Sequence, residues 1–267
     1  MMYTYQDLMR DLENLRIDSR GTVLVHSSMK SIGPVEGGAD TVLDALMDYM
    51  KDGLLVLPTH TWALVNAKNP YFHVDKTPTN VGILTELFRK RPGVVRSFHP
   101  THSVAAYGKD AGEFIAGEEK HDTPCARGSV YGKLLDREGT ILLVGVDHRR
   151  NTFIHGVEEW LDIPGRLTDH HEQLYTVLPD GTEISVPQRR HVGHTSERYW
   201  KVDELLEEYG AVYKGKLGDA TVRVCDTVKL TKILTAILKI DPELFSDHEP
   251  IRPEVEKKFR ETWKGFS

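Results

Sequence analysis

The chain has 267 residues, of which 39% are apolar and 28% charged, and its formal net charge is −6. This length and composition are typical of a folded globular protein and exclude a disordered or fibrous chain. The acidic balance, without a basic stripe, argues against nucleic-acid binding, and no apolar run is long enough to cross a membrane. We therefore expect neither a nucleic-acid nor a membrane partner.

The N-terminal segment predicts an amphipathic helix and not an export signal. Residues 5–15 place leucines at helical spacing behind Thr4, a candidate N-cap. Acidic residues stand where a signal peptide needs a basic and then an apolar run. The two cysteines, Cys125 and Cys225, suit a reducing compartment. These features predict a cytoplasmic protein.

Short β-rich runs then alternate with amphipathic segments. Predicted strands cover 22–25, 54–57, 94–96, 103–108 and 140–145, and predicted helices cover 40–50, opened by Asp40, and 80–90. Parallel strands need crossover segments, and helices usually supply them. The pattern therefore predicts an α/β fold with a mainly parallel or mixed central sheet that is covered on both faces.

The pattern changes after residue 165. Two β-rich runs flank Asp180 and Gly181, which predicts a small antiparallel hairpin near 170–190. Further helices are predicted at 202–210, 226–240 and 253–263. No internal repeat is present. We expect a single domain over residues 1–267 with this hairpin as a small subregion.

Polar, histidine-rich loops follow four of the predicted strands, after Val25, Leu57, Val95 and Gly145. In open α/β sheets, ligands bind outside the carboxyl ends of the strands, so these loops are expected to meet at one crevice. The first loop is rich in glycine but has neither the Walker nor the GxGxxG pattern. An extended cofactor such as pantetheine suits a loop of this kind.

Two HxxH spacings raise the question of a metal site. They are His99 with His102 and His191 with His194. Pro100 and Gly193 prevent either pair from sharing a regular helix, and no cysteine lies nearby in the sequence. Zinc sites in proteins usually need three or four cysteine, histidine or carboxylate ligands in tetrahedral geometry. We therefore expect no metal.

The segment NTFIHGVEEW, residues 151–160, follows the last predicted strand at the start of a helix. Thr152, His155 and Glu158 are three residues apart, which places their Cβ atoms roughly 5–6 Å from one another on a helix. A carboxylate beside an imidazole can orient it as a general base. A solvated helix face has the same pattern, so the residues alone leave both interpretations open.

Four motifs resemble those of a known family in order and character. They are VHSSMKSIG, GLLVLPTHTW, RPGVVRSFHPTHSVAAYG and ILLVGVDHRRNTFIHGVEE. Together they are similar to the aminoglycoside N3-acetyltransferases, also called antibiotic N-acetyltransferases, over about residues 5–240. The resemblance implies a three-layer αβα fold, and transfer of an acetyl group from acetyl-CoA to an amine without a covalent enzyme intermediate.

The resemblance also implies roles for individual residues. The implied catalytic residues are His155 as general base, Glu158 as its orienting carboxylate, Thr152 at the thioester and His26 near the reacting centre. The implied coenzyme contacts are Ser27, Ser28, Met29, Lys30, Ser31, Arg96 and Ser103. The first candidate acceptor is the 3-amino group of a 2-deoxystreptamine aminoglycoside, an activity that confers antibiotic resistance.

The sequence leaves open which amine accepts the acetyl group. A polycationic aminoglycoside needs an acidic cleft, for which Glu118, Glu119, Asp122 and Asp169 are candidates. Arg149 and Arg150 directly precede the NTxxHxxE motif, and they disfavour a polycation nearby. The alternatives are another amine acceptor or a non-catalytic CoA-binding protein. The sequence also leaves the oligomeric state open, and a homo-oligomer is one alternative.

Overall fold

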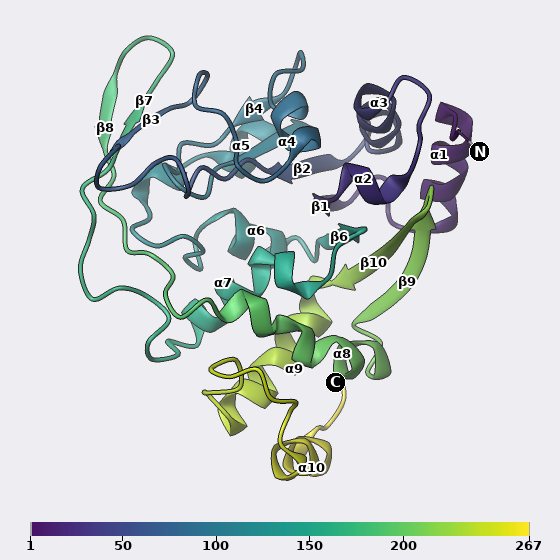
Figure 1. Cartoon of the computed structure of the whole chain (residues 1–267), viewed down its shortest axis with the longest axis vertical. Coiled ribbons are helices and arrows are strands. Elements are labelled where there is room, and N and C mark those ends of the chain that lie inside the picture. The colour runs from purple at the N-terminus through teal and green to yellow at the C-terminus, as the bar shows by residue number, and fades with distance from the viewer. Residues whose placement is uncertain (1, 267) are drawn as a thin grey trace.

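The computed structural model describes residues 2–266 and contains a seven-stranded sheet (Figure 1). The strand order is β4 (Val95–Arg96), β5 (Val104–Gly108), β2 (Leu54–Pro58), β1 (Thr22–Ser27), β6 (Thr140–Val144), β10 (Ala220–Asp226) and β9 (Val212–Leu217). Only β1 pairs in parallel, with β2 and with β6, and the other neighbours are antiparallel. The α/β class with a mixed sheet is confirmed.

The sheet is less parallel than the alternation of strands and helices indicated. β4 and β5 are joined by a short loop, and β9 and β10 by a turn at Gly218 and Asp219. Connections this short can join only antiparallel neighbours. The sequence reasoning had missed β9 and β10 entirely, although buried and more exposed residues alternate along β10.

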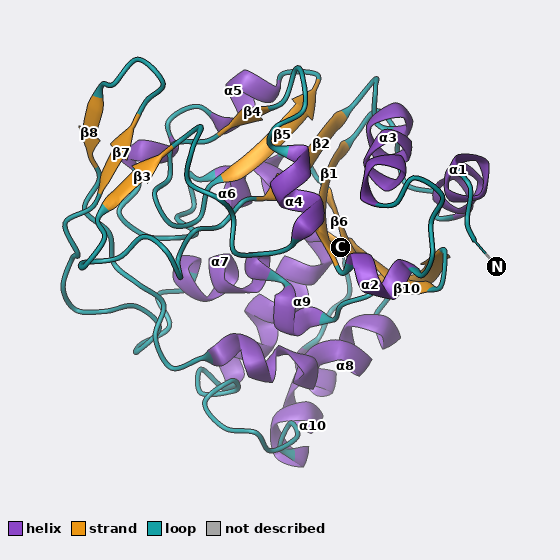
Figure 2. Ribbon diagram, turned by 45° about the horizontal axis from the view of Figure 1, so that its top comes forward, coloured by secondary structure: helices purple, strands orange, loops and turns teal. Residues whose placement is uncertain are grey.

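Helices cover both faces of this sheet, so the three-layer prediction is confirmed (Figure 2). One face packs against α1 (Tyr5–Asn14), α3 (Ala39–Tyr49) and α4 (Ile83–Phe88). The other packs against α5 (Ala111–Ile115), α6 (Val130–Asp136), α7 (Thr152–Trp160) and α9 (Thr227–Ile240). α8 (Asp203–Glu208) packs against the 3₁₀ helix η3 (Thr195–Val202) and β9, and α10 (Pro253–Thr262) packs against α9, while α2 (Met29–Ile32) follows β1. No helix of residues 2–266 is both long and apolar enough to span a membrane.

Alternation along β1 decides where its last side chains point. Val23 and Val25 pack with α1 and α3, whereas Leu24 packs with α7 and α9. Successive side chains of a strand point to opposite faces, so His26 points to the same face as Leu24. His26 is therefore directed toward the layer that contains α7.

The predicted hairpin is present as β7 (Tyr175–Val177) and β8 (Glu183–Ser185), which pair antiparallel. A strand that was not predicted, β3 (Tyr71–His73), pairs with β7 in parallel and completes a three-stranded sheet. This small sheet lies at one end of the molecule, at the upper left of Figure 1. The assignment of the whole chain to a single domain stays a prediction.

The start of α1 agrees with the sequence prediction, but the start of α3 differs from it. The Thr4 hydroxyl accepts from Asp7 N–H, and the Asp7 carboxylate accepts from Thr4 N–H, so α1 begins with the expected cap. The helix predicted from Asp40 is α3, which begins at Ala39 behind Gly38, so the prediction that Asp40 opens it was wrong. Asp40 instead pairs with Arg91 at 2.9 Å.

Candidate active site

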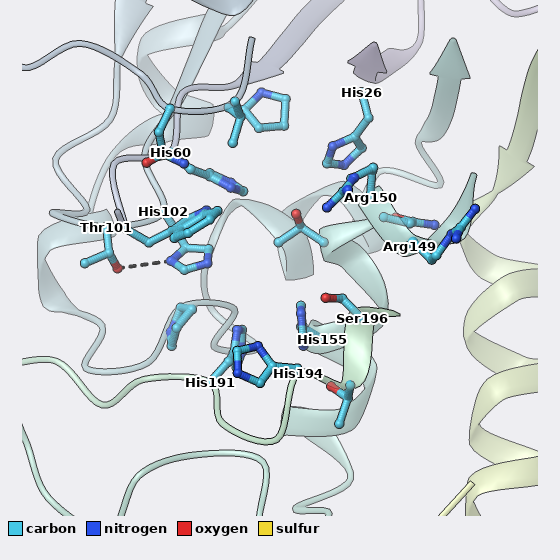
Figure 3. A pocket seen from close by; sticks show the side chains of 18 of the residues that line it. His26, His60, Thr101, His102, Arg149, Arg150, His155, His191, His194 and Ser196 are labelled. Atoms are coloured by element: carbon cyan, nitrogen blue, oxygen red, sulfur yellow. Dashed lines mark hydrogen bonds between the residues drawn. The ribbon is translucent and has the colours of Figure 1, made fainter. Parts of the chain in front are cut away.

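A cavity of about 770 Å³ opens beside the carboxyl ends of β1, β2 and β6 (Figure 3). Its wall includes His26 and Ser27 from β1 and residues just after β2 and β6. Other parts come from the start of α7, from the 3₁₀ helix η2 (His148–Arg150) and from the segment 190–196, which leads into the 3₁₀ helix η3 (Thr195–Val202). Thr101 and His102, in the loop after β4, also line the wall. The expectation that polar loops meet at one crevice is confirmed for these segments.

The start of α7 presents two of the predicted catalytic residues to this cavity. The Asn151 side chain accepts from Phe153 N–H at 3.3 Å and caps the helix, which begins at Thr152. Thr152 and His155 both line the wall. The His155 side chain is 14% exposed, so the face of α7 that carries it is a cavity wall and not a solvated surface.

Glu158 lies one turn behind His155 and is fully buried. The distance from Glu158 Oε2 to His155 Nδ1 is 3.5 Å, longer than a charged hydrogen bond. The hydroxyl of Tyr199 lies between them: it is 2.7 Å from His155 Nδ1 and donates to Glu158 Oε2. Glu158 is therefore linked to His155 mainly through the Tyr199 hydroxyl, and not by the direct hydrogen bond that the sequence predicted.

Further groups hold the Glu158 carboxylate. Arg166 Nε donates to Oε1 at 2.6 Å, and the Thr195 hydroxyl donates to Oε2 at 3.2 Å. Burial alone raises the pKa of Glu158, but the nearby His155, the hydrogen bond from Tyr199 and the charge of Arg166 hold that pKa below its usual value. The carboxylate is therefore ionised at neutral pH.

The environment of His155 keeps its imidazole neutral. Burial and the neighbouring His191 lower the pKa of His155 to about 4. The His155 and His191 rings stack with centroids 4.0 Å apart, and His191 Nε2 is 2.6 Å from Glu159 Oε1. An imidazole with this pKa has an unprotonated nitrogen available at pH 7.

His26 faces the same cavity from the opposite side (Figure 3). Its Nε2 is buried and has no hydrogen-bond partner among the described residues. Burial lowers the pKa of His26 to about 3, and the pKa values of His60 and His102 also lie well below the usual range. His26, His60 and His102 are thus neutral hydrogen-bonding groups and not fixed positive charges.

The predicted coenzyme loop lies at the end of β1, and only Ser27 of it lines the cavity. Ser28 stands at the N-cap position of the short helix α2 but makes no side-chain capping bond. Its hydroxyl is 2.9 Å from that of Ser31, which donates to the Gly145 carbonyl at 3.2 Å. Met29 and Lys30 continue this turn. The loop therefore borders the cavity, and coenzyme contact by these residues stays a prediction.

Arg96 and Ser103, also predicted to contact the coenzyme, do not line the cavity. Arg96 is buried and donates to the carbonyls of Thr59, Val74 and Thr77, and its Nε lies 3.2 Å from the hydroxyl of Ser103. Because its donors are used within the protein, Arg96 ties the end of β2 to the loop before α4. The geometry gives the predicted coenzyme contacts of this pair no support.

The acidic candidates for the acceptor site also lie elsewhere. Glu118 is buried and accepts from Val130 N–H at 2.8 Å, while Asp122 pairs with His171 and Asp169 with His170. None of these residues, nor Glu119, lines the cavity. The charged residues that do line it, among those described, are Arg149, Arg150 and Arg190.

One group of potential metal ligands occurs within residues 2–266. The ligand atoms of Cys125, Glu159 and His191 lie within 4.8 Å of one another. Glu159 Oε1 already accepts from Cys125 N–H at 3.0 Å and contacts His191 Nε2. This group contains only one histidine, His191, of the two HxxH pairs. Neither pair therefore supplies both of its histidines to the group.

Sequence reasoning missed Tyr199, Thr195 and Arg166. Tyr199 is 44 residues from His155 in the chain, and no local pattern connects them. His191 had been noted only as part of an HxxH spacing. Tyr199 and Thr195 reach His155 and Glu158 because η3 packs against α7.

Fold and site together define an α/β protein of three layers, with a neutral histidine and a buried carboxylate at a cavity beside the strand ends. The profile of the aminoglycoside 3-N-acetyltransferase family matches residues 24–239. That match covers well over half of the chain, which therefore belongs to this family of acyltransferases.

Individual relatives agree with this assignment. The chain is 30% identical to the SPbeta prophage-derived aminoglycoside N(3')-acetyltransferase-like protein YokD of Bacillus subtilis (strain 168), over 83% of this chain and 87% of that protein. It is 29% identical to aminoglycoside N(3)-acetyltransferase IV of Salmonella sp, over 92% of each.

Solved structures match over similar lengths. The crystal structure of YokD superposes with a TM-score of 0.78 at 28% identity and covers 88% of this chain and 93% of that one. A mutant of the aminoglycoside acetyltransferase AAC(3)-IVa in complex with a gentamicin has a TM-score of 0.80 at 26% identity, over 92% of both chains.

Proposed function

We propose that this protein transfers the acetyl group of acetyl-CoA directly to an amine, with His155 as general base. The observation that carries the proposal is the position of His155: it is neutral, lines a cavity at the strand ends, and is linked to the buried Glu158 carboxylate through Tyr199. Family membership supports the same chemistry. The reaction is expected in the cytoplasm, where acetyl-CoA is available.

Acetyl-CoA supplies a thioester whose carbonyl carbon the amine attacks. The cavity volume of about 770 Å³ lies within the usual range for small-molecule sites, and Ser27 lines its wall at the end of β1. Ser27 and the turn from Ser28 to Ser31 are the residues that would hold the coenzyme. No described residue supplies a covalent attachment in this scheme.

Proton transfer falls to His155. As the neutral amine nitrogen bonds to the acyl carbon, His155 Nε2 takes one proton from it. The carbon–sulfur bond then breaks, and the leaving thiolate takes that proton back from the His155 imidazolium to become the free thiol. The carbonyl oxygen becomes negative during attack, and Thr152 and the unpartnered Nε2 of His26 are the groups of the wall that can donate to it. One such donor is worth about 2.7–4 kcal/mol in comparable sites.

The first candidate acceptor is the 3-amino group of a 2-deoxystreptamine aminoglycoside, in line with the names of the relatives. A specific observation favours a second candidate, an amine of lower positive charge. The wall carries three arginines and, among the described residues, no carboxylate. A polycation close to such a wall meets repulsion that an acceptor with a single amine largely avoids.

The test is release of free thiol from acetyl-CoA with two acceptor panels, one of aminoglycosides and one of amines with a single positive charge. Turnover with either panel supports acetyl transfer, and the better panel decides the acceptor class. His155→Ala is expected to lower kcat by about 100-fold or more while acetyl-CoA binding is retained. His248→Ala, an exposed histidine outside the cavity, is the control.

Two results would contradict the proposal. Thermal stabilisation by acetyl-CoA without product from any amine would favour a non-catalytic CoA-binding protein. Full activity of the His155→Ala variant would remove this histidine from the reaction.

A further inference from the structure

Tyr199 is buried at the junction between His155 and Glu158, and its hydroxyl touches both. A phenol has one proton to donate and can accept through its oxygen. Its contact with Glu158 involves an ionised carboxylate, which only accepts, so the phenol proton is directed to Glu158. The phenol oxygen is then left to accept from the imidazole.

This order of donors determines which imidazole nitrogen carries the proton. His155 Nδ1 is 2.7 Å from an oxygen that has already given its proton away, so Nδ1 must be the protonated nitrogen. Nε2 is then unprotonated, as a general base requires. Thr195 supports the arrangement, since its hydroxyl is 3.2 Å from Glu158 Oε2 and 3.2 Å from Tyr199 Oη.

We propose that Tyr199 is the positioning residue of the active site, which sets the His155 tautomer and transmits the charge of Glu158 to it. The proposal rests on His155 being the general base. The direct distance of 3.5 Å from Nδ1 to Oε2 is too long for the carboxylate to do this alone. Arg166, on the far oxygen of Glu158, keeps the carboxylate charged and fixed.

The same geometry stabilises the charge that develops in the reaction. When His155 takes a proton at Nε2, the imidazolium donates its Nδ1 proton to a phenol oxygen that Glu158 polarises. Buried hydrogen-bond chains of this kind strengthen each link, because the effective dielectric constant is low. Burial and Glu158 raise the pKa of Tyr199 well above its usual value, so the phenol stays protonated throughout.

The first measurement uses the wild-type protein and does not depend on turnover. In ¹⁵N NMR spectra of histidine-labelled protein at neutral pH, the signals that disappear in the His155→Ala variant belong to His155. We expect a protonated Nδ1 and an unprotonated Nε2. A protonated Nε2, or rapid averaging of the two tautomers, would overturn the proposal even if acetyl transfer is confirmed.

The second measurement uses Tyr199→Phe, which removes only the hydroxyl. We expect kcat to fall about 10- to 100-fold with the KM values for acetyl-CoA and the amine nearly unchanged, as for other groups that orient a functional side chain. The His155 signals should then report a mixture of tautomers. Unchanged kcat and an unchanged tautomer would overturn the proposal.

The control is Tyr49→Phe, because Tyr49 also uses its hydroxyl internally, donating to the Ile17 carbonyl at 2.8 Å, but lies outside the cavity. It is expected to leave kcat and the His155 tautomer unchanged. If no amine is turned over by the wild-type protein, the proposed function fails, while the NMR spectrum still decides the role of Tyr199.

Discussion

Arg166 donates from Nε to Glu158 Oε1 at 2.6 Å, and both side chains are buried. Removal of the cation leaves the buried Glu158 carboxylate with only the hydroxyl donors of Tyr199 and Thr195. Breaking a buried pair in this way typically costs about 3–5 kcal/mol. Arg166→Met is therefore expected to lower the free energy of unfolding by that order, as measured by urea denaturation.

Two further variants check this explanation. Arg10→Met removes a largely exposed pair with Asp7 and should change the free energy of unfolding far less. Glu158→Gln combined with Arg166→Met removes both charges and should recover part of the loss. A single Arg166→Met variant as stable as the wild type would show that the pair does not stabilise the fold.

The pKa of His155 predicts how activity depends on pH. Burial and His191 lower that pKa to about 4, so the neutral base persists well below pH 6.5. As pH falls through about 4, protonation of His155 should abolish transfer. After correction for the fraction of neutral amine, a profile of kcat/KM against pH should therefore stay level to about pH 5 on its acid side. A loss of activity centred near pH 6.5 would mean that His155 is not buried as described.

Buried histidines also make stability depend on pH. Burial lowers the pKa values of His26 and His148 to about 3 and of His99 to about 4, from an unfolded value of 6.5. Between these values the unfolded chain binds protons that the folded chain does not, so the free energy of unfolding falls as pH decreases. The stabilisation is complete above about pH 6.5 and is lost toward about pH 3–4.

Urea denaturation between pH 8 and pH 4 measures this effect. We expect a stable plateau above about pH 6.5 and a progressive decline below it. His248→Asn, at an exposed position, should leave the decline unchanged. Equal free energies of unfolding at pH 7 and pH 4.5 would contradict the assigned pKa directions.

Arg150 is the most exposed of the cationic groups in the cavity wall, with a side chain 64% exposed and one contact, 3.4 Å from Glu197. Arg150→Gln removes a positive charge that repels a polycation. We expect kcat/KM for aminoglycosides to rise by roughly three- to tenfold at low salt, and less at high salt because of screening. Arg20→Gln, outside the cavity, is the control, and an unchanged or lower kcat/KM would contradict the prediction.

Gly218 in the turn between β9 and β10 is expected to resist substitution. Its φ is +59°, and a Cβ there would lie 2.4 Å from the Ile32 carbonyl oxygen. Gly181, in the β7–β8 hairpin, has φ +88° but no atom within 4 Å of such a Cβ. Both changes to alanine carry backbone strain of about 1–2 kcal/mol, and only Gly218→Ala adds a clash. Equal losses in thermal or urea denaturation would contradict this distinction.

Local pattern determined much of this protein without the structure. The capped helix behind Thr4, the buried strands at the centre of the sheet, and the helix that carries Thr152, His155 and Glu158 all follow from periodicity and capping over a few residues. The motif resemblance led to the family. These features depend on neighbours in the chain, which a sequence displays directly.

Tertiary structure alone decided the rest. The distance between Glu158 and His155 and the place of Tyr199 between them depend on how η3 packs against α7 across 44 residues of chain. The use of the Arg96 donors inside the protein, and the absence of carboxylates from the described cavity wall, depend equally on long-range packing. Such contacts have no period or spacing in the sequence, because side chains far apart in the chain meet only when the layers assemble.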